Sequence, residues 1–164
     1  MQKICFELEV YSFHIDMAAL REVPSRIKAD FIGHVNNIVY VQWMEIGRTK
    51  LLEAIGMPTH EILEQGFVPV LVQTNITYKS PLYLGDRVRV ELWLSELRNA
   101  SAIMQFRFYN AEGTLAAEGW QKGLFAERKL IRPRRLRPEE RALFLPYVHQ
   151  TDEVTPANSF VGVS

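Results

Sequence analysis

The sequence predicts an α+β domain in which one long central helix is wrapped by a curved, five-stranded antiparallel sheet. Two observations support this fold. Five segments either alternate between apolar and polar residues or are rich in β-branched and aromatic residues, as strands are. One segment between the first two of them has apolar residues on most of its circumference, as a helix buried on several sides does. A helix of this kind needs a sheet around it.

The first strand is predicted at Ile4–Phe13, where apolar and polar residues alternate. Met17–Ala29 contains a proline and lacks periodicity, so we expect a connecting loop, and loops of this length tend to be functional or mobile. The central helix is predicted at Asn37–Ile55, with Asn36 as its N-cap and a stop at Gly56-Met57-Pro58.

After a short helical segment at Thr59–Gln65, the chain changes to strand character. Loops of hairpin length separate the last three strands, so we expect these strands to form an antiparallel meander. A short helix is predicted at Pro138–Leu145, because Pro and Glu occupy its first turn. The four predicted strands are Phe67–Tyr78, Arg87–Leu97, Ala102–Tyr109 and Thr114–Ala126.

Length and composition fit one globular domain, because the chain has 164 residues, of which 48% are hydrophobic and 23% charged. We assign residues 1–146 to this domain and expect residues 147–164 to form a flexible tail, since they are polar and weakly periodic. A formal net charge of zero argues against a nucleic-acid partner.

The compartment is expected to be the cytoplasm. Cys5 is the only cysteine, so no intramolecular disulfide and no thiolate metal cluster can form, which favours a reducing environment. The first twenty residues do not resemble a secretory signal, and no apolar run has the length needed to cross a bilayer. We therefore expect no membrane partner.

The segment from Asp30 to Asn37 leads straight into the predicted helix and carries the candidate chemistry. A helix N-terminus presents free N–H groups and a partial positive charge, which can stabilise an oxyanion. A carboxylate at Asp30 can then orient water or attack an acyl carbon beside that position, which is a geometry for acyl transfer. The alternative is structural, with Asp30 and Asn36 as caps and Gly33 as a turn residue.

Two motifs stand at a characteristic separation along the chain. The first reads Gly-His-Val-Asn-Asn-Ile-Val-Tyr from Gly33 to Tyr40 and continues with Glu45 and Arg48; the second reads Tyr-Lys-Ser-Pro-Leu-Tyr-Leu-Gly-Asp over residues 78–86. With the order of elements, these motifs resemble the 4-hydroxybenzoyl-CoA thioesterase-like branch of the hotdog superfamily over about residues 4–127. The resemblance implies the hotdog fold and thioester hydrolysis.

By this resemblance, Asp30 falls on the catalytic carboxylate and Asn37 on the position whose backbone N–H polarises the thioester carbonyl. In relatives the motif follows the first strand almost at once, so if residues 17–30 are an insertion, Asp16 takes the catalytic place. We favour Asp30 because it is contiguous with the helix entry. His34 can act as a general base, but we expect it to position the site.

Gly33 and Tyr40 are the expected substrate contacts at the helix entry. Glu45 is a second candidate carboxylate, since another hotdog branch uses one on the helix, and its structural alternative is an ion pair with Arg48 at i,i+3. The expected walls of an acyl pocket, each with a core role as its alternative, are Phe31, Val39, Tyr40, Trp43 and Phe67.

Basic residues gather near the C-terminus, where residues 128–141 contain seven of them against two glutamates. This excess of positive charge can meet the phosphates of coenzyme A or the acidic face of an acyl-carrier protein. Arg132 and Arg134 are the expected phosphate contacts in this segment, and Lys79 is a further one. The alternative is a solvated basic tail.

These inferences favour a thioesterase that hydrolyses an acyl-CoA or acyl-carrier-protein thioester to free acid and thiol. Neither a metal nor a separate cofactor is expected, because coenzyme A or phosphopantetheine is part of the substrate. One alternative is a non-catalytic acyl-thioester-binding hotdog module. The other is a hotdog dehydratase or hydratase, which needs His34 and Glu45 to converge on one substrate carbon.

A homodimer, or a tetramer built from two dimers, is the expected assembly. Strands such as Val88–Leu94 and Ile103–Phe108 are expected to carry apolar side chains on both faces, and the chain has too few helices to cover both. The resemblance also implies an active site between two subunits.

Overall fold

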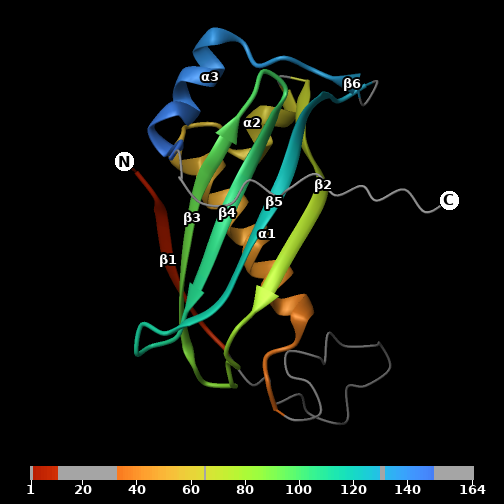
Figure 1. Cartoon of the computed structure of the whole chain (residues 1–164). Helices are drawn as coiled ribbons and strands as arrows, with labels where there is room; N and C mark the ends of the chain where they lie inside the picture. The colour runs from red at the N-terminus through yellow and green to blue at the C-terminus, as the bar shows by residue number, and fades with distance from the viewer. Residues whose placement is uncertain (1, 11–32, 65, 130–131, 150–164) are drawn as a thin grey trace, which may run out of the picture.

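The computed structural model describes residues 2–10, 33–64, 66–129 and 132–149, and the structural statements below concern these residues. Their elements follow the predicted order (Figure 1). The predicted end of the first strand at Phe13 and the predicted loop at 17–29 lie outside the described residues.

The elements are β1 (Ile4–Glu9), α1 (Asn37–Ala54), α2 (Thr59–Glu64), β2 (Phe67–Tyr78), β3 (Arg87–Leu97), β4 (Ser101–Tyr109), β5 (Leu115–Glu127), β6 (Arg132–Pro133) and α3 (Pro138–Phe144), followed by a 3₁₀ turn at Leu145–Tyr147.

The sheet is antiparallel and has the strand order β1-β3-β4-β5-β2, with α1 against one of its faces (Figure 1). The predicted meander of β3, β4 and β5 is therefore confirmed. The sheet has one more strand than predicted, because the basic segment folds back along β5 and forms the two-residue strand β6. No helix in the described ranges has both the length and the hydropathy of a membrane span.

Two glycines set how closely α1 approaches the sheet. A Cβ at Gly47, in the middle of α1, would lie 3.0 Å from a ring carbon of Phe106 on β4. A Cβ at Gly119, on β5, would lie 2.9 Å from the methyl carbon of Met44 and 2.3 Å from the carbonyl oxygen of Asn75. A glycine inside a helix lowers the stability of the helix by about 1 kcal/mol relative to alanine, so the close packing at Gly47 must offset that loss.

The two faces of the sheet differ more than the sequence suggested. On β3, Val88 and Leu92 are fully buried on the α1 side, whereas Arg89 and Glu91 lie on the other face and form an ion pair. Trp93 is the apolar exception on that outer face, and it is covered by Lys3, whose Nζ lies 4.7 Å from a Trp93 ring centroid. The prediction of apolar residues on both faces is wrong for β3, because charged side chains already cover its outer face.

The predicted tail begins inside the domain. The backbone N–H of His149 donates to the carbonyl oxygen of Leu94 at 2.7 Å, and its Nε2 lies 2.8 Å from the carbonyl oxygen of Gln2. Val148 forms an isolated parallel bridge with Leu94, and His149 is buried. Residues 147–149 therefore differ from the expected flexible tail, because a backbone hydrogen bond to β3 and the contact of the His149 ring with Gln2, just before β1, hold them in place.

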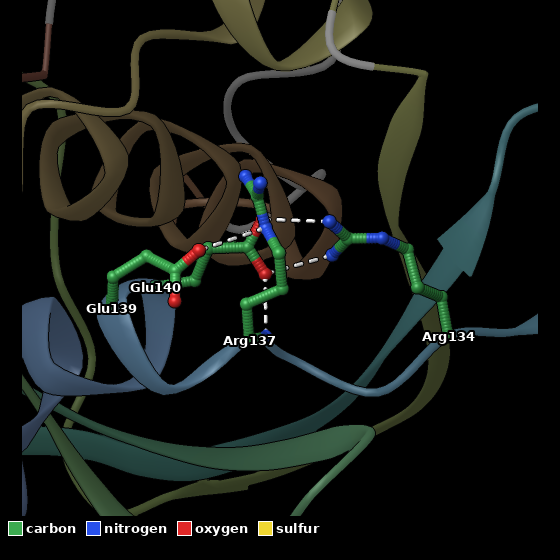
Figure 2. Close-up of polar contacts among 4 residues, drawn as sticks. All are labelled: Arg134, Arg137, Glu139 and Glu140. Carbon is green, nitrogen blue, oxygen red and sulfur yellow. Dashed lines mark hydrogen bonds and ion pairs between the residues drawn. The ribbon is translucent and has the colours of Figure 1, made fainter.

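A buried carboxylate fixes α3 and the basic segment (Figure 2). Glu140 is only 3% exposed, and its two oxygens accept hydrogen bonds from both Nη atoms of Arg134 at 2.7 and 2.9 Å. The backbone N–H and the Nε of Arg137 donate to the same carboxylate at 2.8 and 2.9 Å. Burial alone would raise the pKa of Glu140, but these hydrogen bonds outweigh burial and lower that pKa to about 2.

We expect Glu140→Gln to lower the free energy of unfolding at pH 7 by about 3 kcal/mol, which is the value of a pKa held about 2.5 units below that of an ordinary glutamate. Because the folded-state pKa of Glu140 is depressed, its hydrogen bonds with Arg134 and Arg137, here called the Glu140 clamp, stabilise the fold above about pH 4.5. This stabilisation is lost as the pH falls toward 2. Urea denaturation across this range should show the wild type converging on the variant.

Glu139→Gln is the matched control. The Glu139 carboxylate pairs with Arg137 at 3.3 Å, but its side chain is 66% exposed, so its loss should cost less than about 1 kcal/mol. Equal losses from the two variants would contradict the assignment of Glu140 as the clamp.

Candidate functional site

The start of α1 is held against the turn between β2 and β3. The backbone N–H of Val35 donates to the carbonyl oxygen of Leu82 at 2.8 Å, and His34 forms an isolated bridge with Tyr83. Gly33 has a φ of +89°, which favours glycine and turns the chain into this bridge. The motif at residues 33–40 and the turn motif at residues 78–86 are distant in the sequence, and they therefore form one structural unit in the fold.

The cap of α1 leaves the backbone donor of Asn37 open. Asn36 is extended, and its Oδ1 accepts from the N–H of Ile38 at 2.9 Å, while its carbonyl oxygen accepts from the N–H of Val39 at 2.9 Å. Asn37 is exposed, and its N–H has no acceptor among the described residues. This N–H sits at the positive end of an 18-residue helix, where it can donate to a developing oxyanion.

Asn36 therefore acts as the predicted cap. Because its side chain accepts from the N–H of Ile38, the N–H of Asn37 stays open. The predicted carboxylates Asp30 and Asp16 both lie outside the described residues. In the described ranges, no three His, Cys, Asp or Glu side chains are grouped so that they can hold a metal ion.

Tyr40 lies behind the helix start rather than on its surface. It is 3% exposed, and its ring makes edge contacts with the rings of Trp43, Tyr78 and Phe108 at centroid distances of 5.1 to 5.4 Å. Burial first, and then Tyr78 and Asp86, raise the pKa of Tyr40 to about 12, so its hydroxyl stays neutral at physiological pH. Trp43 is also buried, so the aromatic cluster of Tyr40, Trp43, Tyr78 and Phe108 packs behind the helix start.

Tyr83 is a site residue that sequence reasoning did not single out. Its ring meets the His34 ring edge-on at 5.2 Å, and about half of its surface is exposed beside the helix start. The backbone N–H of Tyr83 donates to Oδ2 of Asp86 at 2.8 Å, which fixes the turn. The sequence placed Tyr83 inside the turn motif, but no pattern there indicated its contact with His34.

The charged candidates near the helix are already paired. Lys79 Nζ lies 2.7 Å from a carboxylate oxygen of Glu118. Glu45 forms the predicted ion pair with Arg48. Eight residues separate Glu45 from Asn37, which is about 12 Å along the helix, so Glu45 does not converge with the helix start within one chain.

The predicted phosphate contacts Arg132 and Arg134 lie at the opposite end of the sheet. Tyr78 pairs with Ala117 beside the helix start, whereas Arg132 pairs with Glu127, which is ten residues further along β5. At about 3.3 Å per strand residue, the two places are about 30 Å apart in one chain. Arg134 is held by Glu140, while Arg132 is exposed. The structure therefore separates the predicted site residues into two groups.

Comparisons with known proteins agree with this geometry. A family model described as the thioesterase-like superfamily matches residues 25–144. A Bacillus subtilis relative named as an acyl-CoA thioesterase is 26% identical over 106 residues, which cover 65% of this chain and 77% of the relative. A chloroplastic acyl-acyl carrier protein thioesterase of Arabidopsis thaliana is 28% identical over 144 residues, which cover 84% of this chain and 74% of the relative.

Among solved structures, a DHNA-CoA thioesterase from Staphylococcus aureus superposes with a TM-score of 0.73. The two sequences are 19% identical, and the match covers 89% of this chain and 91% of the other. This similarity supports the fold, and the family model covers most of the chain. The chain therefore belongs to the thioesterase-like superfamily and shares the fold of the hotdog thioesterases.

Proposed function

We propose that this protein hydrolyses an acyl-CoA or acyl-carrier-protein thioester to a free acid and a thiol. The observation that carries the proposal is the open N–H of Asn37 at the start of α1. The named relatives support this class of reaction, because one is called an acyl-CoA thioesterase and the other an acyl-acyl carrier protein thioesterase.

In the proposed reaction, the Asn37 N–H donates a hydrogen bond to the thioester carbonyl oxygen and stabilises the charge that develops on it. Asp30 either activates a water that attacks the carbonyl carbon or attacks it directly to give an anhydride that water then hydrolyses. The C–S bond breaks and the sulfur leaves as a thiolate. Free thiols have a pKa of about 8.5, so the leaving group needs little help from an acid.

We also propose that the active unit is a homodimer joined through β2. This strand lies at one edge of the sheet, spans twelve residues and contains no charged side chain. The other edge strand, β1, is only six residues long and carries two glutamates, which is how soluble proteins protect an edge. The charged outer face of β3 does not favour pairing of sheets face to face, so β2 is the better site for a second copy.

Asn37→Pro tests the open donor. Proline is favoured at the first position of a helix, and the extended Asn36 (φ −65°, ψ 145°) tolerates a following proline, so the helix should persist without this N–H. We expect kcat to fall by roughly 100- to 1,000-fold with little change in the thermal midpoint. Asn37→Ala keeps the N–H and should lose far less; equal losses would assign the role to the side chain instead.

Asp30→Asn should lower kcat by at least about 100-fold without unfolding the protein, since it removes the group that activates water or attacks the thioester. Release of free thiol from decanoyl-CoA measures the rate. Asp16→Asn is the matched control in the same part of the chain. If the Asp16 variant is inactive and the Asp30 variant is not, the catalytic carboxylate is Asp16.

Val72→Lys tests the dimer edge. Val72 lies within β2 and is 48% exposed, so a lysine there places charge on the pairing strand without entering the core. Sedimentation equilibrium should show the wild type at twice 19.0 kDa and the variant shifted toward the monomer, with activity lost in parallel. Ala111→Lys, in the exposed β4–β5 turn, is the control. A wild-type monomer with full activity would exclude the dimer.

A further inference from the structure

The helix α3 has an inner face that is fixed to the domain and an outer face that is apolar and exposed. On the inner face, the Phe144 ring lies 5.5 Å from the Phe125 ring, and Glu140 forms the Glu140 clamp. On the outer face, Leu143 is 43% exposed, and Leu145, in the turn that follows, is 51% exposed. Together with the exposed residues beside them, they form what we call the α3 stripe: Pro138, Ala142, Leu143, Leu145 and Pro146.

The α3 stripe lies far from the candidate site of the same chain. Figure 1 shows α3 at one end of the sheet and the start of α1 at the other. Phe125, which supports α3, lies eight residues along β5 from Ala117, the partner of Tyr78 near the helix start. At about 3.3 Å per residue, this separation is about 26 Å. The α3 stripe is therefore a second surface, distinct from the open donor of Asn37.

The basic segment lies beside the α3 stripe. The backbone N–H of Leu136 donates to the carbonyl oxygen of Asn99 at 2.7 Å, so the residues just before α3 lie against the β3–β4 turn. Nη1 of Arg141, on α3 itself, donates to the carbonyl oxygen of Arg98 in the same turn at 3.3 Å. These contacts hold basic side chains around an apolar helix face.

Several of these cations have no acidic partner. The glutamates of this region are already engaged: Glu139 with Arg137, Glu140 with Arg134 and Arg137, and Glu96 with Arg98. Within the ranges that the structure describes, four cations of the segment form no ion pair: Lys129, Arg132, Arg135 and Arg141. The Glu140 clamp thus consumes the negative charge of the segment and leaves positive charge beside the α3 stripe.

An exposed apolar stripe beside unpaired cations matches the surface of an anionic phospholipid bilayer. Aliphatic side chains enter the boundary between headgroups and acyl chains, while arginine and lysine contact the lipid phosphates. Each cation close to such a surface strengthens binding by about fivefold, so four of them contribute on the order of several hundred-fold. Durable attachment needs two signals, and the α3 stripe and the cations supply one each.

Two other occupants fit the α3 stripe less well. A second copy would bring the stripe against itself, because symmetric pairing places the same patch on both sides, and the unpaired arginines would then face one another. A carrier protein would be docked about 26 Å from the helix start of the same chain. Protein interfaces also favour aromatic anchors, whereas the stripe offers leucine, alanine and proline.

We propose that the α3 stripe docks on the anionic surface of a phospholipid bilayer. Leu143 and Leu145 enter the headgroup boundary, and the four unpaired cations contact lipid phosphates. The prediction of no membrane partner rested on the absence of a signal segment and of a spanning segment, and contact with a bilayer surface needs neither. The inference does not depend on the thioesterase reaction.

Vesicle flotation tests the docking with the full-length protein. The vesicles are phosphatidylcholine alone or phosphatidylcholine with about 30% phosphatidylglycerol. We expect the partition coefficient to be at least about tenfold higher on the anionic vesicles, and to fall at least about tenfold between about 0.05 and 0.5 M NaCl, because salt screens the cations. Absence of binding to the anionic vesicles at low salt would overturn the proposal.

Leu143→Ser tests the apolar part of the surface. It should lower the partition coefficient by about fivefold, and addition of Leu145→Ser should bring the loss to at least about tenfold, because both side chains leave water on docking. Leu84→Ser is the matched control, since Leu84 is 42% exposed and lies in the turn at the opposite end of the sheet. Equal losses from Leu84→Ser and Leu143→Ser would contradict docking through α3.

Arg135→Gln tests the charged part and should lower the partition coefficient by about fivefold. Its control is Lys122→Gln on the outer face of β5, which removes an unpaired cation away from α3 and should have little effect. If the double leucine variant fails to fold, Ala142→Glu places negative charge on the same exposed face and should weaken anionic binding by at least about fivefold.

Two outcomes would assign the α3 stripe to another occupant and overturn the membrane proposal. In the first, the wild type ignores vesicles but binds acyl-carrier protein, and Leu143→Ser abolishes that binding. In the second, sedimentation equilibrium without lipid shows self-association that Leu143→Ser abolishes, which would assign the stripe to a second copy.

Discussion

The close packing of α1 on the sheet is the constraint on which the rest of the structure depends. Gly47 and Gly119 have no side chains, so the helix can approach β4 and β5 to a distance at which a Cβ atom on either residue would crowd its neighbours. This approach brings Tyr40 into contact with Tyr78 and Phe108, and so places the helix start beside the turn after β2. The position of the Asn37 donor is therefore a consequence of packing in the core.

The Asn36 cap and the turn motif each accept hydrogen bonds from backbone N–H groups at the helix start. Asn36 Oδ1 accepts from the N–H of Ile38, the Asn36 carbonyl oxygen accepts from the N–H of Val39, and the Leu82 carbonyl oxygen accepts from the N–H of Val35. An oxygen that approaches the helix start therefore meets the open N–H of Asn37 between backbone groups that are held by these hydrogen bonds. Such preorganisation is what makes a backbone donor effective in catalysis, because little reorganisation is needed as charge develops.

The sequence predicted the regular elements well because their signals are local. β2 and β3 match the predicted ranges from end to end, since both are rich in strand-forming residues and short turn-forming segments separate them from their neighbours. The signals failed where contacts are distant. Nothing in the sequence distinguishes Arg134, which a buried glutamate holds, from the exposed Arg132 two residues earlier. His149 is held by its contacts with the backbone carbonyl oxygens of Leu94 and Gln2, which leave no pattern in the side chains of the sequence.

The absence of charged side chains from β2 also affects how the newly synthesised chain assembles. Before a second copy pairs with it in the proposed dimer, β2 presents unpaired backbone groups along twelve residues that include no charged side chain and one proline, Pro69, near the start of the strand. Dimerisation is second order in concentration, whereas capture by other unfolded chains grows with crowding and heat. In the proposed dimer, correct assembly therefore competes with aggregation, and the measured stability depends on the protein concentration.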